Sequence, residues 1–108
     1  MKIGILGGTF NPVHIGHLIL AEEVLEKLRL DRVIFIPANL PPHKDNVDIA
    51  SPNLRLKMIK SAIKGNKNFA VSEIEIKRPG RSYTIDTLRA LKEKYPKDEL
   101  FFIIGSDL

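Results

Sequence analysis

The sequence predicts an α/β fold in which helices cover a mostly parallel sheet. Short apolar runs alternate with segments of helical periodicity, in the order strand, helix, strand, helix, strand, helix, strand. Joining parallel strands through helices requires right-handed crossovers, which limits the topologies available. The 108 residues are 44% hydrophobic and 28% charged, which is typical of one folded domain. We therefore expect a single domain over residues 1–108.

Four short segments rich in Ile, Val and Phe are the predicted strands. They are Lys2–Leu6, Val33–Pro37, Phe69–Ile76 and Leu100–Ile104. Three of them are continuous apolar runs bounded by glycine, proline or charged residues, as expected of strands buried on both faces. Phe69–Ile76 instead ends in strict alternation, which places Ile74 and Ile76 inward and Glu73 and Glu75 outward. This segment is either a strand or an extended connection.

Three segments of helical periodicity separate these runs. Their predicted apolar faces are Ile15, Leu18, Ile19, Leu25 and Leu28 in the first, Leu56, Ile59, Ala62 and Ile63 in the second, and Ile85, Leu88 and Leu91 in the third. Ser51 and Pro52 provide an N-cap and a first helical residue for the second helix, which we expect to end near Gly65. The third helix should end before Pro96.

Unusual residues follow the carboxyl end of every predicted strand. The segments are "GGTFNPVHIGH", "NLPPHK", "RPGRSYT" and "GSD", in chain order. In an open parallel sheet, ligands bind beyond the carboxyl ends of the strands. We therefore expect these four segments to meet at one rim and to form one site.

The composition excludes several classes of function. The chain has no cysteine, which excludes disulfides, thiolate metal sites and a cysteine nucleophile and is compatible with the cytoplasm. No apolar run approaches the ~20 residues of a membrane span, and the run after Lys2 is too short for a signal peptide. The formal net charge of +4 favours anionic ligands such as nucleotides. No aromatic residues are interleaved with a basic cluster, so we expect no nucleic-acid binding.

The glycine-rich turn Gly7-Gly8-Thr9-Phe10 lies between the first strand and the first helix. Glycine there allows a ligand to approach the backbone and its N–H groups, although any tight turn can also use glycine. The turn is neither the G-x-G-x-x-G fingerprint nor a P-loop, because no Gly-Lys-Ser/Thr follows.

His14 and His17 stand three residues apart at the predicted start of that helix. Residues at this spacing share one helix face, and a helix N-terminus attracts anions. Three interpretations are open: phosphate binding, two structural histidines, or zinc. Zinc needs a third ligand, for which His43 is the remaining histidine, and helical zinc pairs commonly use i, i+4 spacing. The adjoining glycine turn favours phosphate. Gly16 weakens the helix unless another group must pass close to it.

The motifs resemble those of a known enzyme family. "GGTFNPVHIGH" is similar to the signature of the H-x-G-H nucleotidyltransferase superfamily. "PANLPPHK", "IKRPGRSYTIDTL" and "FFIIGSDL" narrow the resemblance to bacterial nicotinate-nucleotide adenylyltransferases. The resemblance implies a Rossmann-like nucleotidyltransferase fold, and transfer of AMP from ATP to nicotinate mononucleotide to form deamido-NAD and pyrophosphate.

The resemblance also implies roles for individual residues. The ATP-binding residues would be Gly7, Gly8, Thr9, Phe10, His14, His17, Gly105 and Asp107, and the pyridine-nucleotide residues would be Asn39, His43, Lys44, Tyr83 and Thr84. His14 and His17 would be the catalytic pair, with Mg²⁺ bound mainly by the ATP phosphates rather than by the protein. Each segment also has a simpler interpretation as a rigid turn or a helix cap.

Family members continue beyond the G-x-D segment with a serine/threonine-rich motif and an arginine. The resemblance therefore implies that the chain is the N-terminal part of the family domain. A non-catalytic nucleotide-binding module and a related adenylyl- or cytidylyltransferase with another phosphate acceptor, such as phosphopantetheine or a sugar-alcohol phosphate, remain alternatives. The expected partners are ATP and nicotinate mononucleotide, and a homo-oligomer is left open.

Overall fold

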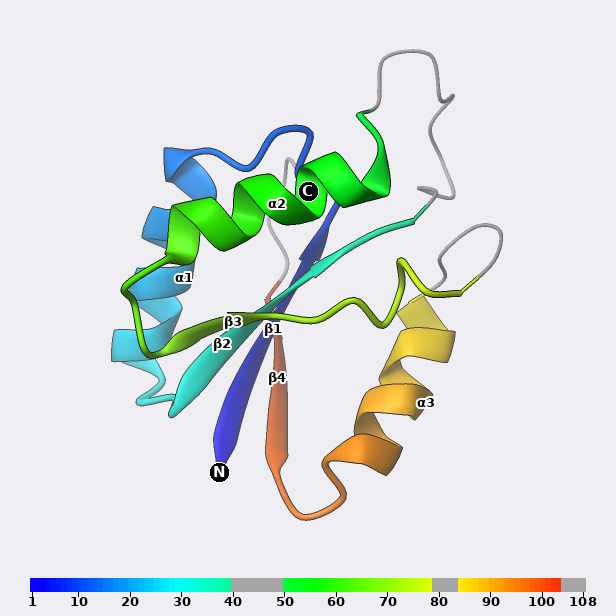
Figure 1. Cartoon of the computed structure of the whole chain (residues 1–108). Helices are drawn as coiled ribbons and strands as arrows, with labels where there is room; N and C mark the ends of the chain where they lie inside the picture. Colours follow the sequence, from blue (N-terminus) through cyan, green and yellow to red (C-terminus); the bar gives the residue numbers. More distant parts are fainter. Residues whose placement is uncertain (40–49, 79–83, 104–108) are drawn as a thin grey trace.

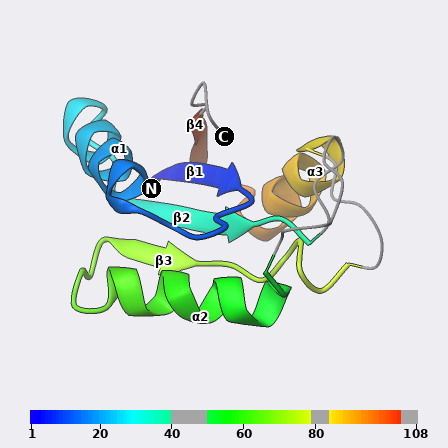
Figure 2. The ribbon, with the colours of Figure 1, turned by 90° about the horizontal axis from the view of Figure 1, so that it is seen from above.

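Four parallel strands form one sheet in the computed structural model, which describes residues 1–39, 50–78 and 84–103. The strands are β1 (Lys2–Gly8), β2 (Arg32–Pro37), β3 (Phe69–Val71) and β4 (Glu99–Ile103) (Figure 1). They lie in the order β3-β2-β1-β4 (Figure 2). In the register of this sheet, Ile5 of β1 lies between Ile34 of β2 and Phe102 of β4. The predicted α/β class and parallel sheet are confirmed.

Three helices connect the strands: α1 (Ile15–Lys27), α2 (Pro52–Ile63) and α3 (Thr84–Lys94). Helices α1 and α2 lie on one side of the sheet and α3 on the other (Figure 1). The reason is topological, because β1, β2 and β3 follow one another in one direction across the sheet, whereas β4 returns to the far side of β1. Right-handed crossovers in opposite directions place their helices on opposite faces.

Two apolar clusters, one on each face of the sheet, form the core. The cluster beneath α1 and α2 contains Leu6, Phe10, Ala21, Leu30, Val33, Phe35, Ile59, Ile63 and Ile103. The cluster beneath α3 contains Ile3, Ile5, Ile34, Ile36 and Leu91. Because β1 and β2 contribute to both clusters, their continuous apolar runs are buried on both faces, as their composition predicts. The same prediction is wrong for the run that forms β4, where Phe102 is exposed because β4 is the last strand in the described sheet.

The segment Phe69–Ile76 is only partly a strand. Its pairing with β2 ends at Val71, and the chain then turns, with the N–H of Lys77 donating to the carbonyl of Glu73 at 3.0 Å. Glu75 does not point outward as predicted, since its carboxylate accepts a hydrogen bond from the Thr87 hydroxyl at 2.6 Å. An edge segment paired with β2 alone has few ladder bonds to keep it extended.

The predicted apolar helix faces are wrong at several positions. Ile15, Ile19 and Leu28 of the first face, Ala62 of the second and Ile85 of the third are solvent-exposed. In α1 the buried side chains are His17 and Ala21 instead. A small alanine at the contact lets the helix lie close to the sheet, which turns the bulkier Ile15 and Ile19 toward solvent. The N-cap at Ser51 and the buried Leu56, Ile59 and Ile63 agree with the prediction.

Candidate functional site

The turn after β1 is anchored in the core by Phe10. Gly7 and Gly8 belong to β1 itself, pairing with Ile36 and Pro37, so the predicted glycine turn begins only at Thr9. Phe10 adopts the left-handed backbone conformation, with φ of 52°. Its ring is buried and lies 5.8 Å from the ring of Phe35, centroid to centroid. Burial of this aromatic ring offsets the cost of a backbone conformation that non-glycine residues rarely adopt.

His14 and His17 meet at the N-terminus of α1, with their ring centroids 3.9 Å apart. His14 is the N-cap residue, and its Nδ1 accepts the N–H of Gly16 at 3.1 Å. The Nδ1 of His17 accepts the N–H of His14 at 3.0 Å. His17 is buried, with its ring against that of Phe10 at 4.8 Å in an edge-to-face arrangement. The two imidazoles lie together as predicted, but not on one helix face, because His14 is the N-cap residue, has an extended backbone and precedes the first residue of α1.

The hydrogen bonds at both Nδ1 atoms determine where the imidazoles carry their protons. A nitrogen that accepts a backbone N–H cannot also hold a proton, so each neutral ring is protonated at Nε2. An Nε2–H group is a donor suited to a phosphate oxygen. A metal ion would have to displace that proton and bind through Nε2.

Gly16 leaves room for the ring of His14. A Cβ atom at position 16 would lie 2.9 Å from Cε1 and 3.0 Å from Nδ1 of His14. The expectation that another group must pass close to this glycine is therefore correct, and that group is the neighbouring imidazole. A larger residue would push the His14 ring away from its cap position.

Arg55 on α2 is the main residue of this rim that the sequence pattern did not reveal. Its side chain is fully buried, and its guanidinium donates to four backbone carbonyl oxygens. The acceptors are Ala50 at 2.9 Å from Nε, Thr9 at 2.7 Å and Ala38 at 2.6 Å from Nη1, and Asn39 at 3.0 Å from Nη2. Burial lowers the pKa of this guanidinium below its ordinary value.

A sequence signal for Arg55 does exist. Residues 55, 59 and 63 follow one another at i, i+4 spacing, so Arg55 lies in line with the buried Ile59 and Ile63. An arginine on the apolar face of a helix is buried with that face, so its guanidinium needs hydrogen-bond partners inside the protein.

A second set of polar contacts continues from Asn39 across the rim. The side-chain amide of Asn39 donates to the carbonyl of Arg78 at 2.7 Å. The guanidinium of Arg78 in turn donates to the hydroxyl of Thr87 on α3, which is buried and also donates to Glu75. On the other side, the side-chain carbonyl of Asn11 accepts the N–H of Ala50 at 2.9 Å. Segments that follow β1, β2 and β3 are thus joined by side-chain hydrogen bonds.

The structure brings together part of the predicted site. Thr9, Phe10, His14, His17 and Asn39 all lie at the carboxyl edge of the sheet or in the connections that leave it. Thr84 is the first residue of α3. The predicted residues His43, Lys44, Tyr83, Gly105 and Asp107 lie outside the described residues. The proposed roles of all these side chains stay predictions.

The described residues contain neither a metal-binding cluster nor a membrane-spanning helix. Within residues 1–39, 50–78 and 84–103, there is no group of three or more His, Asp or Glu side chains that could hold a metal ion. The helices of these same ranges include none with the length and apolar character needed to cross a membrane. The expected cytoplasmic location stays a prediction.

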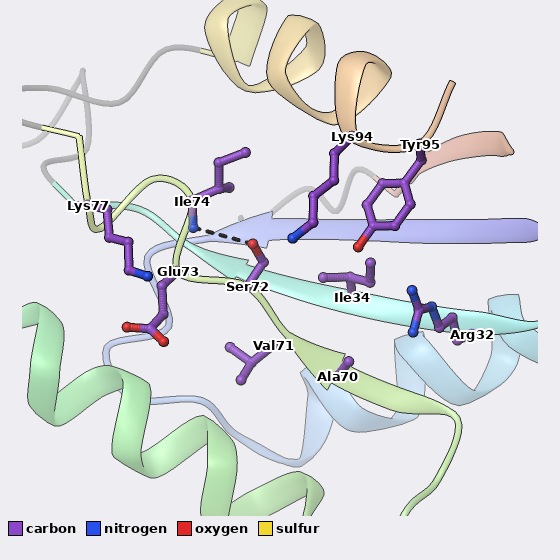
Figure 3. A pocket seen from close by; sticks show the side chains of 10 residues that line it. All are labelled: Arg32, Ile34, Ala70, Val71, Ser72, Glu73, Ile74, Lys77, Lys94 and Tyr95. Carbon is purple, nitrogen blue, oxygen red and sulfur yellow. Dashed lines mark hydrogen bonds between the residues drawn. The ribbon is translucent and has the colours of Figure 1, made fainter. Parts of the chain in front are cut away.

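A cavity of about 380 Å³ lies beside the β2 and β3 edge of the sheet, away from the histidines. Figure 3 shows Lys94 and Tyr95 at the end of α3 above Arg32 and Ile34 of β2, with Ser72, Glu73 and Lys77 from the segment after β3. None of the predicted site residues lines it. Lys77 and Lys94 are solvent-exposed, as lysines commonly are, so this lining is no evidence for a second anion site.

Comparison with known proteins identifies relatives over the whole chain. The cytidylyltransferase-like family model matches residues 5–108. A probable nicotinate-nucleotide adenylyltransferase of Geobacter sulfurreducens is 59% identical over 107 residues, covering 99% of this chain and 50% of the relative. One from Exiguobacterium sibiricum is 52% identical, covering 99% of this chain and 56% of the relative. The chain thus spans about half the length of these curated relatives.

Solved structures agree on the fold. A Vibrio parahaemolyticus protein named as a nicotinate-nucleotide adenylyltransferase matches with a TM-score of 0.76 at 30% identity, covering 99% of this chain and 60% of that one. The Plasmodium falciparum nicotinic acid mononucleotide adenylyltransferase, solved in complex with NaAD, matches with a TM-score of 0.83 at 20% identity, covering 99% and 53%. The predicted Rossmann-like nucleotidyltransferase fold is confirmed.

Proposed function

The chain belongs to the cytidylyltransferase-like family, and on this premise we propose that the protein transfers AMP from ATP to nicotinate mononucleotide. The products are deamido-NAD and pyrophosphate. The observation that carries this proposal is the pair of imidazoles at the N-terminus of α1, each tied at Nδ1 to a backbone N–H. The similarity to relatives named nicotinate-nucleotide adenylyltransferase supports this choice of acceptor.

The reaction needs alignment more than acid–base chemistry. A phosphate oxygen of nicotinate mononucleotide attacks the α-phosphorus of ATP, and the bond from that phosphorus to the bridging oxygen of the β-phosphate breaks. The attacking oxygen is already ionised at neutral pH, so no general base is required. Catalysis then depends on holding the two phosphates in line and on stabilising the charge that develops.

The histidine pair is suited to that stabilisation. Two Nε2–H groups at a helix N-terminus are donors in a region of positive potential, where phosphate oxygens bind favourably. Their Nδ1 contacts restrain both rings before substrate arrives, so little reorganisation is needed during the reaction. We assign His17 the contact with the α-phosphate, because its ring is buried and supported by Phe10.

We further propose that Mg²⁺ enters as its complex with ATP. The family is one of nucleotidyltransferases, whose reaction suggests a divalent metal. The described rim brings no three His, Asp or Glu side chains together, whereas Mg²⁺ prefers oxygen ligands and commonly keeps phosphates and water in its coordination shell. The described part of the site therefore fits a metal carried by the substrate, which neutralises phosphate charge when bound.

Pyrophosphate release tests the proposal. The protein expressed from its complete reading frame is incubated with MgATP and with nicotinate mononucleotide, nicotinamide mononucleotide, phosphopantetheine or a sugar-alcohol phosphate. We expect release with nicotinate mononucleotide at a kcat/KM well above that for each other acceptor. A higher kcat/KM with another acceptor would show that the protein is a nucleotidyltransferase of different acceptor specificity. ATP binding by calorimetry with no release for any acceptor would favour a non-catalytic nucleotide-binding module.

A further inference from the structure

The guanidinium of Arg55 donates hydrogen bonds to carbonyl oxygens of three segments that are distant in sequence. Thr9 follows β1, Ala38 and Asn39 follow β2, and Ala50 precedes α2. The N–H of Ala38 also donates to the carbonyl of Gly8 at 2.9 Å, so the ends of β1 and β2 are held at two neighbouring points. The planar fork of a guanidinium can reach several acceptors at once, which a lysine ammonium on a flexible stem does less well.

The charge of Arg55 has no carboxylate partner among the described residues, and the ion pair found there joins the N-terminus to Asp98. Among the described residues, four backbone carbonyl dipoles are what compensates the buried guanidinium. A buried cation of this kind leaves positive potential in its surroundings, and the turn that begins at Thr9 leads directly to His14. An anion bound at the rim would complete the compensation.

Arg55 also fixes the orientation of the four carbonyl groups that it contacts. A carbonyl oxygen that faced a bound phosphate would repel it. With their oxygens directed at Arg55, these groups of Thr9, Ala38, Asn39 and Ala50 are kept from turning toward the ligand. The guanidinium thus favours an anion both through its charge and through the backbone it orients.

We propose that Arg55 is a positioning residue of the nucleotide site, which orders the turn after β1 against the end of β2 and supplies a buried positive charge for a bound triphosphate. It does not touch the substrate. The inference rests on the proposed function, because the anion in question is ATP. It goes beyond that function by assigning substrate alignment to a helix outside the histidine motif.

Three variants of the full-length protein separate geometry from charge. Arg55→Met removes both the fork and the charge, whereas Arg55→Lys keeps the charge but cannot reach all four carbonyls. Arg55→Ala leaves a cavity that an added guanidinium ion can enter. The matched controls are Leu56→Ala, a neighbouring buried residue of α2 whose side chain forms no hydrogen bonds, and Lys57→Met, which removes one exposed charge from the same helix.

The expected results differ between these variants at a temperature where all are folded. Arg55→Met should lower kcat/KM by about 10²-fold, the size seen when reacting groups are misplaced. It should raise the Kd of ATP by about tenfold, as expected for loss of one partly screened charge. Arg55→Lys should keep the Kd of ATP within about threefold but still lower kcat by about tenfold or more, since alignment is lost. Leu56→Ala and Lys57→Met should retain the parent kcat/KM.

Chemical rescue measures whether an added guanidinium ion restores the activity of Arg55→Ala, which distinguishes a positioning role from a purely structural one. Millimolar methylguanidinium should restore part of the activity of Arg55→Ala and none of that of His17→Ala. Proportional losses of activity and stability in Arg55→Met and Leu56→Ala, with no rescue, would show that Arg55 only stabilises the fold. Unchanged kinetics in Arg55→Met would overturn the proposal outright.

Amide hydrogen exchange distinguishes failure of this proposal from failure of the proposed function. Arg55→Met should speed exchange at the N–H groups of Ala38 and Ala50, which hold the rim together, relative to Ile5 in the core. If the parent protein released no pyrophosphate and bound no ATP, the proposed function would fail while this local effect persisted. If exchange rose equally at all three amides, the positioning role would fail whatever the activity.

Discussion

The backbone N–H of His14 donates to Nδ1 of His17 at 3.0 Å, so the two imidazoles act as a helix cap. The usual capping box pairs Ser or Thr at the N-cap with Glu or Gln at N3. Here both positions are histidine, which supplies the same acceptor at Nδ1. Histidine and glutamate differ in the group that remains after this contact is made. Histidine keeps an Nε2–H donor, whereas glutamate would carry a negative charge. With histidine at both positions, the helix N-terminus is capped without a negative charge that would repel a phosphate.

Replacement of His17 by alanine tests its role in transfer. We expect His17→Ala to lower kcat/KM by ~10²–10³-fold, the usual loss when one preorganised donor is removed. The fold should persist, as circular dichroism would check. Ile19→Ala, an exposed residue of the same helix, is the control and should keep the parent rate. Parent activity in purified His17→Ala would refute the assigned role.

The capping hypothesis makes a separate prediction for acidic and neutral replacements. His17→Glu and His17→Gln both retain an acceptor suited to the N3 position, so both should keep the far-ultraviolet spectrum of the parent. His17→Glu should bind ATP more weakly than His17→Gln, because its carboxylate repels phosphate at the helix N-terminus. Calorimetry with ATP would measure the difference. Equal affinities would mean that His17 does not face the triphosphate.

Gly16→Ala should separate helix stability from ligand binding. Alanine favours a helix by up to about 1 kcal/mol over glycine. Its Cβ would nevertheless collide with the His14 ring, whose Cε1 lies 2.9 Å away. We therefore expect ATP affinity to fall severalfold without a matching fall in Tm. Ile15→Ala, next to it and exposed, should change neither quantity, and unchanged affinity in Gly16→Ala would show that the ring position does not matter.

Thr87 should contribute to stability through its hydroxyl. It donates to Glu75 at 2.6 Å and accepts from Arg78, and it is buried. Thr87→Val keeps the shape but leaves two charged groups with one partner fewer, a cost of about 1–3 kcal/mol. Thermal unfolding should show a lower Tm, by roughly 4–8 °C per kcal/mol for a domain of this size. The same substitution in the background of Glu75→Gln should cost less, and equal costs would exclude coupling between the pair.

Removal of divalent metal should affect transfer but not folding. If Mg²⁺ arrives with ATP, the chelator EDTA should leave the Tm of the ligand-free protein unchanged, because the described part of the fold contains no cluster of metal-binding side chains. Pyrophosphate release should stop with EDTA and return when Mg²⁺ matches the ATP concentration. A Tm that fell with EDTA and recovered with Zn²⁺ would instead favour the zinc interpretation of the histidine pair.

Much of the secondary structure followed from local patterns. The runs that include Ile5 and Ile34 are apolar on both faces, which only a strand covered on two sides requires. Ser51 accepts the N–H of Leu54 at 3.2 Å, as its position before Pro52 predicts. The spacing of His14 and His17 predicts that their imidazoles lie close together, although the observed contact is that of a helix cap rather than of a shared helix face. Each of these features depends on residues close together in the chain.

Helix orientation and the rim network required the three-dimensional arrangement. Ile19 and Ala21 are both apolar, and only the close packing of α1 on the sheet makes Ala21 the buried one. Arg55 could not be assigned partners, because its acceptors at Thr9 and Ala38 lie 46 and 17 residues away. Backbone carbonyls are present at every residue, so no sequence pattern marks the ones that a guanidinium will reach.

The amino-acid order by itself determined which segments become strands and helices, and that two imidazoles begin α1, because periodicity, capping and turn formation are local interactions. Only the tertiary structure decided which side chains face the sheet and that one buried cation joins the ends of β1 and β2. Those outcomes depend on packing and on hydrogen bonds between distant segments, which exist only after the chain has folded.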